Sequence, residues 1–232
     1  MESIVLGIVW YVVLLFSLTV HEAAHAWAAK RGGDLTAYHG GQVSLDPTPH
    51  LRREPVGTVI VPVLSYLWIG WMVGWASTPY DPAWAYAHPR RAAWMSLAGP
   101  ASNLFLVLLA AIAIRLGIAA ELLHAPASIT PDHLTAATQA GLFETVATLL
   151  SVAFTLNLLL CIFNLIPLPP LDGSGVLPLF LDDDSARRVM DFMRQPALAL
   201  GGILVAWLVI GRVFSTVHLL AINLLYPGMG YH

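Results

Sequence analysis

The sequence predicts an all-α polytopic membrane protein with about four full transmembrane helices and a fifth, interrupted apolar segment. Of its 232 residues, 57% are hydrophobic and only 11% are charged. A soluble domain of this size carries roughly a quarter of its residues as charges, so the composition indicates a membrane protein. The net charge of -3 is small and the basic residues are scattered, which argues against nucleic acid as a partner.

Four apolar stretches are long enough to cross the roughly 30 Å of hydrocarbon, which takes about 20 residues of helix. They run from Ile4 to Ala29, from Ala93 to Ala119, from Leu142 to Ile166 and from Leu198 to Leu225. We interpret the first stretch as a retained membrane helix, because it has no charged n-region of the kind that begins a signal peptide. The single cysteine, Cys161, excludes an intrachain disulfide.

A fifth apolar stretch, Val56 to Ala76, is interrupted by Pro62, Gly70 and Gly74. It either spans the membrane or enters and leaves on one side. Lys and Arg in short loops collect on the cytoplasmic face, and a re-entrant segment would bring nearly all of them to one face. That face would carry Lys30, Arg31, Arg52, Arg53, Arg90, Arg91, Arg187, Arg188 and Arg194. We therefore favour the re-entrant form with the N-terminus outside, and the spanning form stays open.

The remaining segments predict loops and one small sheet. Residues 34–55 are polar and rich in turn formers, and Gly40-Gly41 separates two short extended pieces, so we expect a small β-hairpin near 36–47. The loop from Leu122 to Thr138 is expected to be an extracytoplasmic connection. We expect one membrane-embedded domain over 1–232, with a core at 1–177 and a linker with the last helix at 178–232.

The sequence His21-Glu22-Ala23-Ala24-His25 matches the pattern H-E-x-x-H. On a helix this spacing places both imidazoles one turn apart on one face, where they can bind one zinc ion. Glu22 lies beside the open position of such a metal and can act as a general base toward water. Ionisable residues at the end of a membrane span are costly to place there without partners, which favours the metal site over a chance match.

A catalytic zinc usually takes three protein ligands, so a third must come from elsewhere. After the third span, a proline-rich helix end presents one carboxylate, Asp172, directly before Gly173. We predict Asp172 as the third ligand, and a turn-forming Asp-Gly pair is the alternative. His39, His50 and His88 lie in loops on the same side and are weaker candidates.

Three motifs, in order, resemble the site-2 protease family of intramembrane zinc metalloproteases, in particular its small bacterial-type members without a PDZ or CBS domain. They are HEAAH at 21–25, LAGPASN at 97–103 and FNLIPLPPLDG at 163–173. The resemblance implies that His21, His25 and Asp172 hold one Zn²⁺ and that Glu22 is the general base. It also implies that Asn103 and Asn164 act as substrate-backbone or oxyanion partners, with helix capping or packing as their alternative.

The function expected from these residues is hydrolysis of peptide bonds in or near transmembrane segments, as in regulated intramembrane proteolysis. The expected partners are single-span or other transmembrane protein substrates and the lipid bilayer, in a prokaryotic cell membrane with the active site toward the cytoplasm. The predicted hairpin could hold an unwound substrate as an added edge strand. The alternative is a metal-binding membrane scaffold or transporter without proteolytic activity, although a scaffold would not need Glu22.

Overall fold

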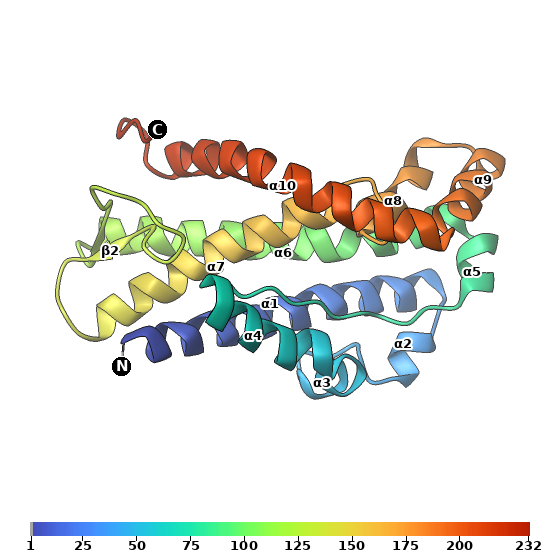
Figure 1. Cartoon of the computed structure of the whole chain (residues 1–232), viewed down its shortest axis with the longest axis horizontal. Helices are drawn as coiled ribbons and strands as arrows, with labels where there is room; N and C mark the ends of the chain where they lie inside the picture. Colours follow the sequence, from blue (N-terminus) through green and yellow to red (C-terminus); the bar gives the residue numbers. More distant parts are fainter. Residues whose placement is uncertain (1) are drawn as a thin grey trace.

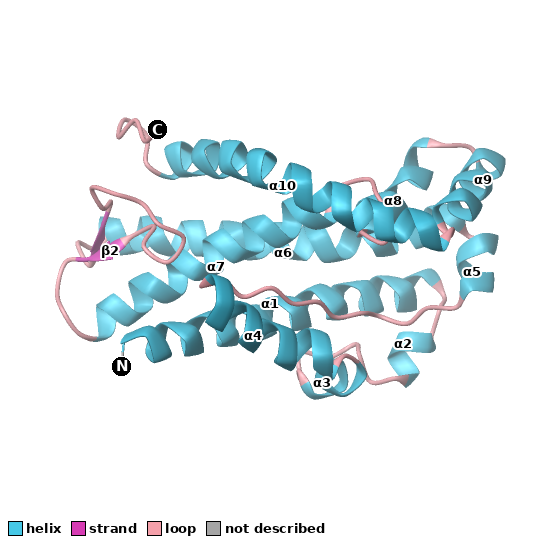
Figure 2. Ribbon diagram, viewed as in Figure 1, coloured by secondary structure: helices cyan, strands magenta, loops and turns pink. Residues whose placement is uncertain are grey.

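The protein is a bundle of four long helices, as Figures 1 and 2 show. The computed structural model describes residues 2–232 and the side chains from Ile4 onward, so Met1, at the start of the predicted domain, lies outside the described residues. The bundle consists of α1 (Glu2–Gly32), α6 (Pro89–Ala119), α7 (Leu142–Asn164) and α10 (Pro196–Leu225).

All four long helices are long and apolar enough to cross a membrane, which confirms the four predicted spans. Helices are the expected form because a backbone in hydrocarbon has to satisfy its hydrogen bonds within its own segment. Successive long helices run in opposite directions, so α1 ends at the same end of the bundle at which α6 begins (Figure 1). The segments that carry the predicted metal ligands therefore meet near that end.

The interrupted apolar stretch enters the bundle and returns to the same end. After α3 (Thr48–Arg53), a π-helical turn at Val56–Ile60 leads into α4 (Val61–Ile69). Pro62 has no N–H to donate, which accounts for an irregular helical turn just before it. Gly70 ends α4 at a φ of +74°, and the chain then runs extended back to α5 (Pro82–Ala87), as Figure 1 shows. This path is the re-entrant form favoured above.

The β-hairpin expected near 36–47 is wrong, because the structure has a short helix, α2 (Thr36–His39), and turns there instead. The side chain of Asp34 explains the difference. Its Oδ1 accepts hydrogen bonds from the N–H of Thr36 at 2.9 Å and from the Thr36 hydroxyl at 2.6 Å, which favours a helical turn over a strand. Although burial opposes ionisation, these bonds and one from the N–H of Asp81 lower the pKa of Asp34.

The described residues do contain one small antiparallel sheet, but it lies in the loop expected to be a plain connection. It pairs β1 (Leu123–His124) with β2 (Ala136–Ala137). This sheet sits at the end of the bundle opposite α5, and the short elements α8 (Asp172–Val176), a 3₁₀ turn at Leu177–Phe180 and α9 (Asp183–Met193) lie at the α5 end (Figure 2).

Candidate metal centre

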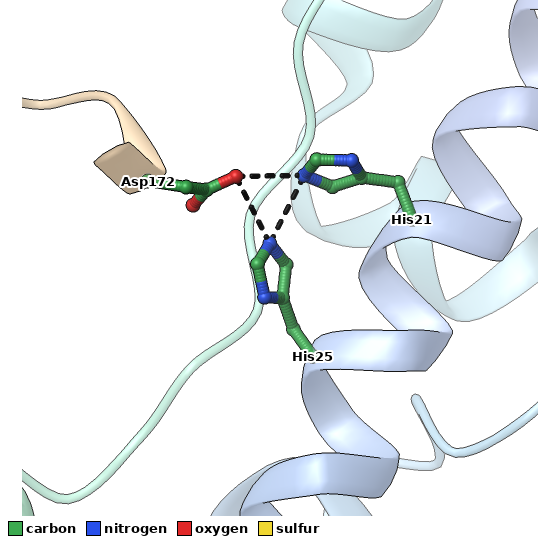
Figure 3. A group of neighbouring side chains, drawn as sticks. All are labelled: His21, His25 and Asp172. Carbon is green, nitrogen blue, oxygen red and sulfur yellow. Dashed lines mark hydrogen bonds and ion pairs between the residues drawn. The ribbon is translucent and has the colours of Figure 1, made fainter. Parts of the chain in front are cut away.

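Three side chains from two separate segments meet at one point, as Figure 3 shows. His21 and His25 project from the same face of α1, and each is 5% exposed. Asp172 is the first residue of α8, which begins after the proline-rich loop that ends α7. The Nε2 atoms of the two histidines are 3.0 Å apart, and Oδ2 of Asp172 lies 3.1 Å from Nε2 of His21 and 3.3 Å from Nε2 of His25. The structure therefore brings the three predicted ligands together.

A hydrogen bond at Nδ1 determines which ring nitrogen of His25 carries the proton. Its Nδ1 lies 2.7 Å from the main-chain carbonyl oxygen of Met95 in α6. Because a carbonyl oxygen can only accept, Nδ1 carries the hydrogen and donates it. In the neutral imidazole Nε2 then presents a lone pair toward Asp172.

A longer chain of hydrogen bonds fixes the proton of His21 in the same way. Asn157 Nδ2 lies 2.8 Å from the carbonyl oxygen of Ala153, so it is the donor, and its Oδ1 accepts from Asn103 Nδ2 at 2.9 Å. The amide of Asn103 therefore turns its oxygen toward His21 Nδ1, at 2.6 Å, and this nitrogen must donate. Nε2 of His21 is left with a free lone pair.

With both imidazoles neutral, two ring lone pairs and one carboxylate oxygen face one another without a hydrogen between them. Such a group repels itself unless a cation sits among its members, and Oδ2 of Asp172 is buried without a hydrogen-bond donor. Zinc takes imidazole nitrogen and carboxylate oxygen at about 2.0–2.2 Å, which places tetrahedral ligands roughly 3.3 Å apart. The observed separations of 3.0–3.3 Å match that arrangement, so the residues fit a zinc ion.

Glycine at position 99 allows α6 to approach this centre. A Cβ atom at Gly99 would overlap Nε2 of His21 and Nε2 of His25. Gly173, directly after the third ligand, is packed in the same way against the carbonyl oxygens of Leu165 and Ile166. Gly99 of the GPASN motif therefore lets α6 come close to the metal ligands, and Gly173 of the LDG motif lets the start of α8 pack against the backbone that follows α7.

Glu22 lies beside the ligands and faces the same cavity. The side chain is 4% exposed, and its Oε2 accepts a hydrogen bond of 2.7 Å from the hydroxyl of Thr78. The cavity has a volume of about 390 Å³ and is lined by Glu22, His25, Asp172 and Thr78, among others. A carboxylate, a cation site and space for a substrate thus adjoin one another.

The extended segment that follows α4 borders this cavity with an unused backbone edge. Ala76, Ser77 and Thr78 all line the cavity. The carbonyl of Ser77 accepts from the side chain of Gln42 at 3.1 Å, whereas the N–H and C=O groups of Ala76 and Thr78 have no hydrogen bond within residues 2–232. In an extended chain, alternate residues direct these groups to the same side. One edge of the segment is therefore covered by Gln42 and the other is open.

Comparisons with known proteins agree with a zinc site at this position. The family model described as "Peptidase family M50" matches residues 9–209. The chain belongs to this family, which comprises the site-2 proteases. It is 35% identical over 167 residues to YwhC of Bacillus subtilis, which is named as a zinc metalloprotease, and this match covers 72% of the chain and 66% of YwhC.

A second relative is Rip2 of Mycobacterium tuberculosis, also named as a zinc metalloprotease. It is 32% identical over 173 residues, covering 75% of the chain and 57% of Rip2. The chain thus spans two thirds or less of the length of these relatives. No solved structure matches the chain. M50 membership identifies zinc as the cofactor that the three ligands fit.

Of the two asparagines predicted from sequence, only Asn103 is hydrogen-bonded to a ligand of this M50 site. It is fully buried against His21, whereas Asn164 is half-buried at the end of α7, where its Nδ2 donates to the carbonyl of Leu160 at 3.1 Å. The three alternative loop histidines do not join the group of metal ligands. His50 is 1% exposed, and this burial lowers its pKa.

Sequence reasoning missed three polar residues that hold the site in place. Asn157 and Ser17 continue the hydrogen-bond chain behind His21, with Asn157 Nδ2 donating to Ser17 Oγ at 2.9 Å, and Thr78 holds Glu22. Asn157 and Ser17 lie in the middle of apolar helices, where an unpaired polar group is costly. The presence of these two polar residues in apolar helices was therefore the sequence signal that could have identified them.

Proposed function

We propose that the protein is an intramembrane zinc metalloendopeptidase that hydrolyses peptide bonds in or near transmembrane segments of membrane proteins, as in regulated intramembrane proteolysis. One observation carries the proposal. Three lone pairs converge on one cation position, and the carboxylate of Glu22 adjoins them on the same cavity. A group that only bound metal would not need that carboxylate.

The role of each residue in the reaction follows from its chemistry. When bound by His21, His25 and Asp172, zinc supplies a Lewis acid that polarises a carbonyl and favours ionisation of water. Glu22 takes the proton of the attacking water at its carboxylate and transfers it to the leaving amine. Thr78 fixes the carboxylate through Oε2, which leaves the other oxygen available for that proton.

The two asparagines suggested by resemblance have different roles in this proposal. Because Asn103 is fully buried and uses its amide on His21 and Asn157, we assign it to orienting His21 instead of binding substrate. Asn164 donates one of the two hydrogens of Nδ2 to the carbonyl of Leu160, and the second is available to a substrate carbonyl. It is retained as a substrate-binding candidate of lower rank.

A substrate needs an extended backbone before its peptide bonds are accessible, because a helix shields them with internal hydrogen bonds. The open edge of Ala76 and Thr78 can pair with such a backbone by strand addition, beside Glu22 and the metal ligands. This segment takes over the role that the sequence suggested for a hairpin at 36–47. Gln42, from that region, supports the segment from its other edge.

Strand pairing can be tested through the substrate backbone. Ester replacements, each removing one N–H, would be placed one at a time at successive positions of a cleavable peptide. Pairing along one edge predicts that KM rises at every second position only, because alternate N–H groups face the edge. Equal effects at all positions, or no effect, would refute this mode of binding.

We also propose an orientation in the membrane. The end of the bundle that carries α5 and α9 holds Arg90 and Arg91 in the first turn of α6, and Arg187 and Arg188 in α9. The positive-inside rule assigns that end to the cytoplasm, in a prokaryotic cell membrane. The metal centre would then open toward the cytoplasmic side, with the N-terminus outside.

The central experiment measures zinc and cleavage together. Wild type, Glu22→Gln and Asp172→Ala would be purified, assayed for bound zinc, and incubated with single-span substrate proteins. We expect Glu22→Gln to retain zinc while the cleavage rate falls by about 10²–10⁴-fold, the range for a lost general base. We expect Asp172→Ala to lose zinc and cleavage alike.

Other results would support other functions. Zinc bound by the wild type without cleavage of any single-span substrate would favour the metal-binding scaffold or transporter. Cleavage that survives Glu22→Gln would remove the assigned base and with it the proposed mechanism.

A further inference from the structure

The outer face of α10 carries a charge at a depth where the bilayer offers no counter-charge. Arg212 lies 16 residues after Pro196, where α10 begins, and 13 residues before Leu225, where it ends. At a rise of about 1.5 Å per residue it sits roughly 24 Å from one end and 20 Å from the other. The polar interfaces lie about 15 Å from the midplane of a 30 Å hydrocarbon layer. Arg212 is therefore close to the midplane.

Arg212 points away from the bundle. The buried residues of α10 include Gly202, Ala206 and Ile210, which follow one stripe of the helix. Arg212 is two positions, or about 200°, from Ile210 and so lies on the opposite side. The exposed residues on that side form the outer face of α10, and apart from Arg212 and Thr216 they are apolar: Val205, Leu208, Val209, Arg212, Thr216 and Leu219. Figure 1 shows α10 along one edge of the bundle.

The guanidinium of Arg212 has no partner among the described side chains, from Ile4 to His232. Arg115, which lies in α6, instead donates to the carbonyl oxygen of Leu225 at 3.1 Å. Charges within membranes are paired or line water-filled cavities, whereas Arg212 has no partner among the described side chains and does not line the cavity at the metal centre. The partner has to come from outside.

We propose that the outer face of α10 binds a transmembrane helix of a different protein, one with an Asp or Glu near the middle of its apolar span. Charge complementarity selects this occupant. A second copy of this chain cannot supply the carboxylate, because Glu22 is 4% exposed and Glu144 lies in the first turn of α7, at a helix end. Two copies would also bring like charges together. The exposed apolar residues around Arg212 provide the packing surface for the partner helix.

The test uses synthetic single-span peptides and the full chain in phosphatidylcholine vesicles. The peptides share one leucine-rich sequence and differ only at the central residue, which is Glu, Leu or Lys. Association with wild type, Arg212→Leu and Arg212→Glu is measured by energy transfer between labels, with Arg115→Leu as the control for loss of a paired arginine. Zinc content of each variant verifies folding. The readout is association, so its result does not depend on proteolysis.

We expect wild type and Arg115→Leu to bind the Glu peptide about tenfold more tightly than the Leu peptide, a difference typical of polar contacts between membrane helices. Arg212→Leu should lose this preference, and Arg212→Glu should prefer the Lys peptide. Equal binding of the Glu and Leu peptides by wild type would overturn the proposal. So would loss of the preference when anionic lipid is added, since Arg212 would then pair with a lipid headgroup of net negative charge.

Discussion

The polar groups inside the bundle and the charge on its outer face differ in one respect. Ser17, His21, Asn103 and Asn157 lie within apolar helices, and each is hydrogen-bonded to another member of the same chain. Arg212 lies within an apolar helix too, yet its guanidinium has no partner among the described side chains. The helices that carry these groups differ in burial as well. In the most apolar stretch of α7, 50% of the residues are buried inside the protein, whereas in that of α10 only 17% are.

This difference separates two uses of polarity in a membrane. A polar group that is satisfied within the chain can hold a catalytic residue in one state, as Asn103 and Asn157 do for the proton of His21. A polar group that the chain leaves unsatisfied can be satisfied only by another molecule. We therefore associate the α1, α6 and α7 side of the molecule with chemistry and the α10 side with recognition.

The largest effect should come from a glycine on the inner side. Gly99→Ala would place a methyl group where Nε2 of His21 and His25 lie, so the ligands must move or α6 must withdraw. We expect zinc affinity to fall by at least about 100-fold, above the range for lost ligand-orienting partners. Competition with a chromogenic chelator measures this affinity.

The matched control is a glycine of α10 that faces outward. A Cβ atom at Gly211 would meet nothing within 4 Å, so Gly211→Ala should leave zinc affinity unchanged. If both substitutions had the same effect, the contrast between the two sides would not hold.

A smaller effect is expected from the polar chain behind His21. Asn157→Leu keeps the volume but removes the amide that turns the oxygen of Asn103 toward His21. We expect zinc affinity to fall by about 10–100-fold, as is typical when a ligand loses its orienting partner. Thr216→Val on the outer face of α10, which also removes a polar group, should have no effect. An Asn157→Leu protein with wild-type zinc affinity would mean that the hydrogen-bond chain does not orient the ligand.

The metal ligands were predictable from sequence because their spacing alone determines much of the geometry. His21 and His25 are four residues apart, so any helix places them on one face, and the proline-rich helix end after the third span presents one carboxylate, Asp172. The apolar runs predicted the spans for a similar reason, since a lipid-facing backbone has few forms to choose from.

The hairpin prediction failed because side-chain hydrogen bonds determine the backbone conformation of this segment. Two short polar pieces around Gly40-Gly41 match a hairpin pattern, but Asp34 bonds to Thr36 and to the N–H of Asp81, 47 residues away. The second bond depends on the return of the re-entrant segment, which local sequence cannot specify. The role of Asn157 was missed for the same reason, because its partners Ser17 and Asn103 come from two other helices.

The smallest expected effect compares Arg115 of α6 with Arg212 of α10. Arg115→Leu removes a hydrogen bond from α6 to the last turn of α10, and because Arg115 is exposed we expect a loss of only about 0.5–1.5 kcal/mol in stability. Arg212→Leu removes an unpaired charge from an apolar face, so the isolated protein should be equally stable or more stable. Thermal unfolding in the same detergent compares them. If Arg212→Leu lowered stability more than Arg115→Leu did, Arg212 would have a partner within the chain, and the outer face of α10 would no longer require one from another protein.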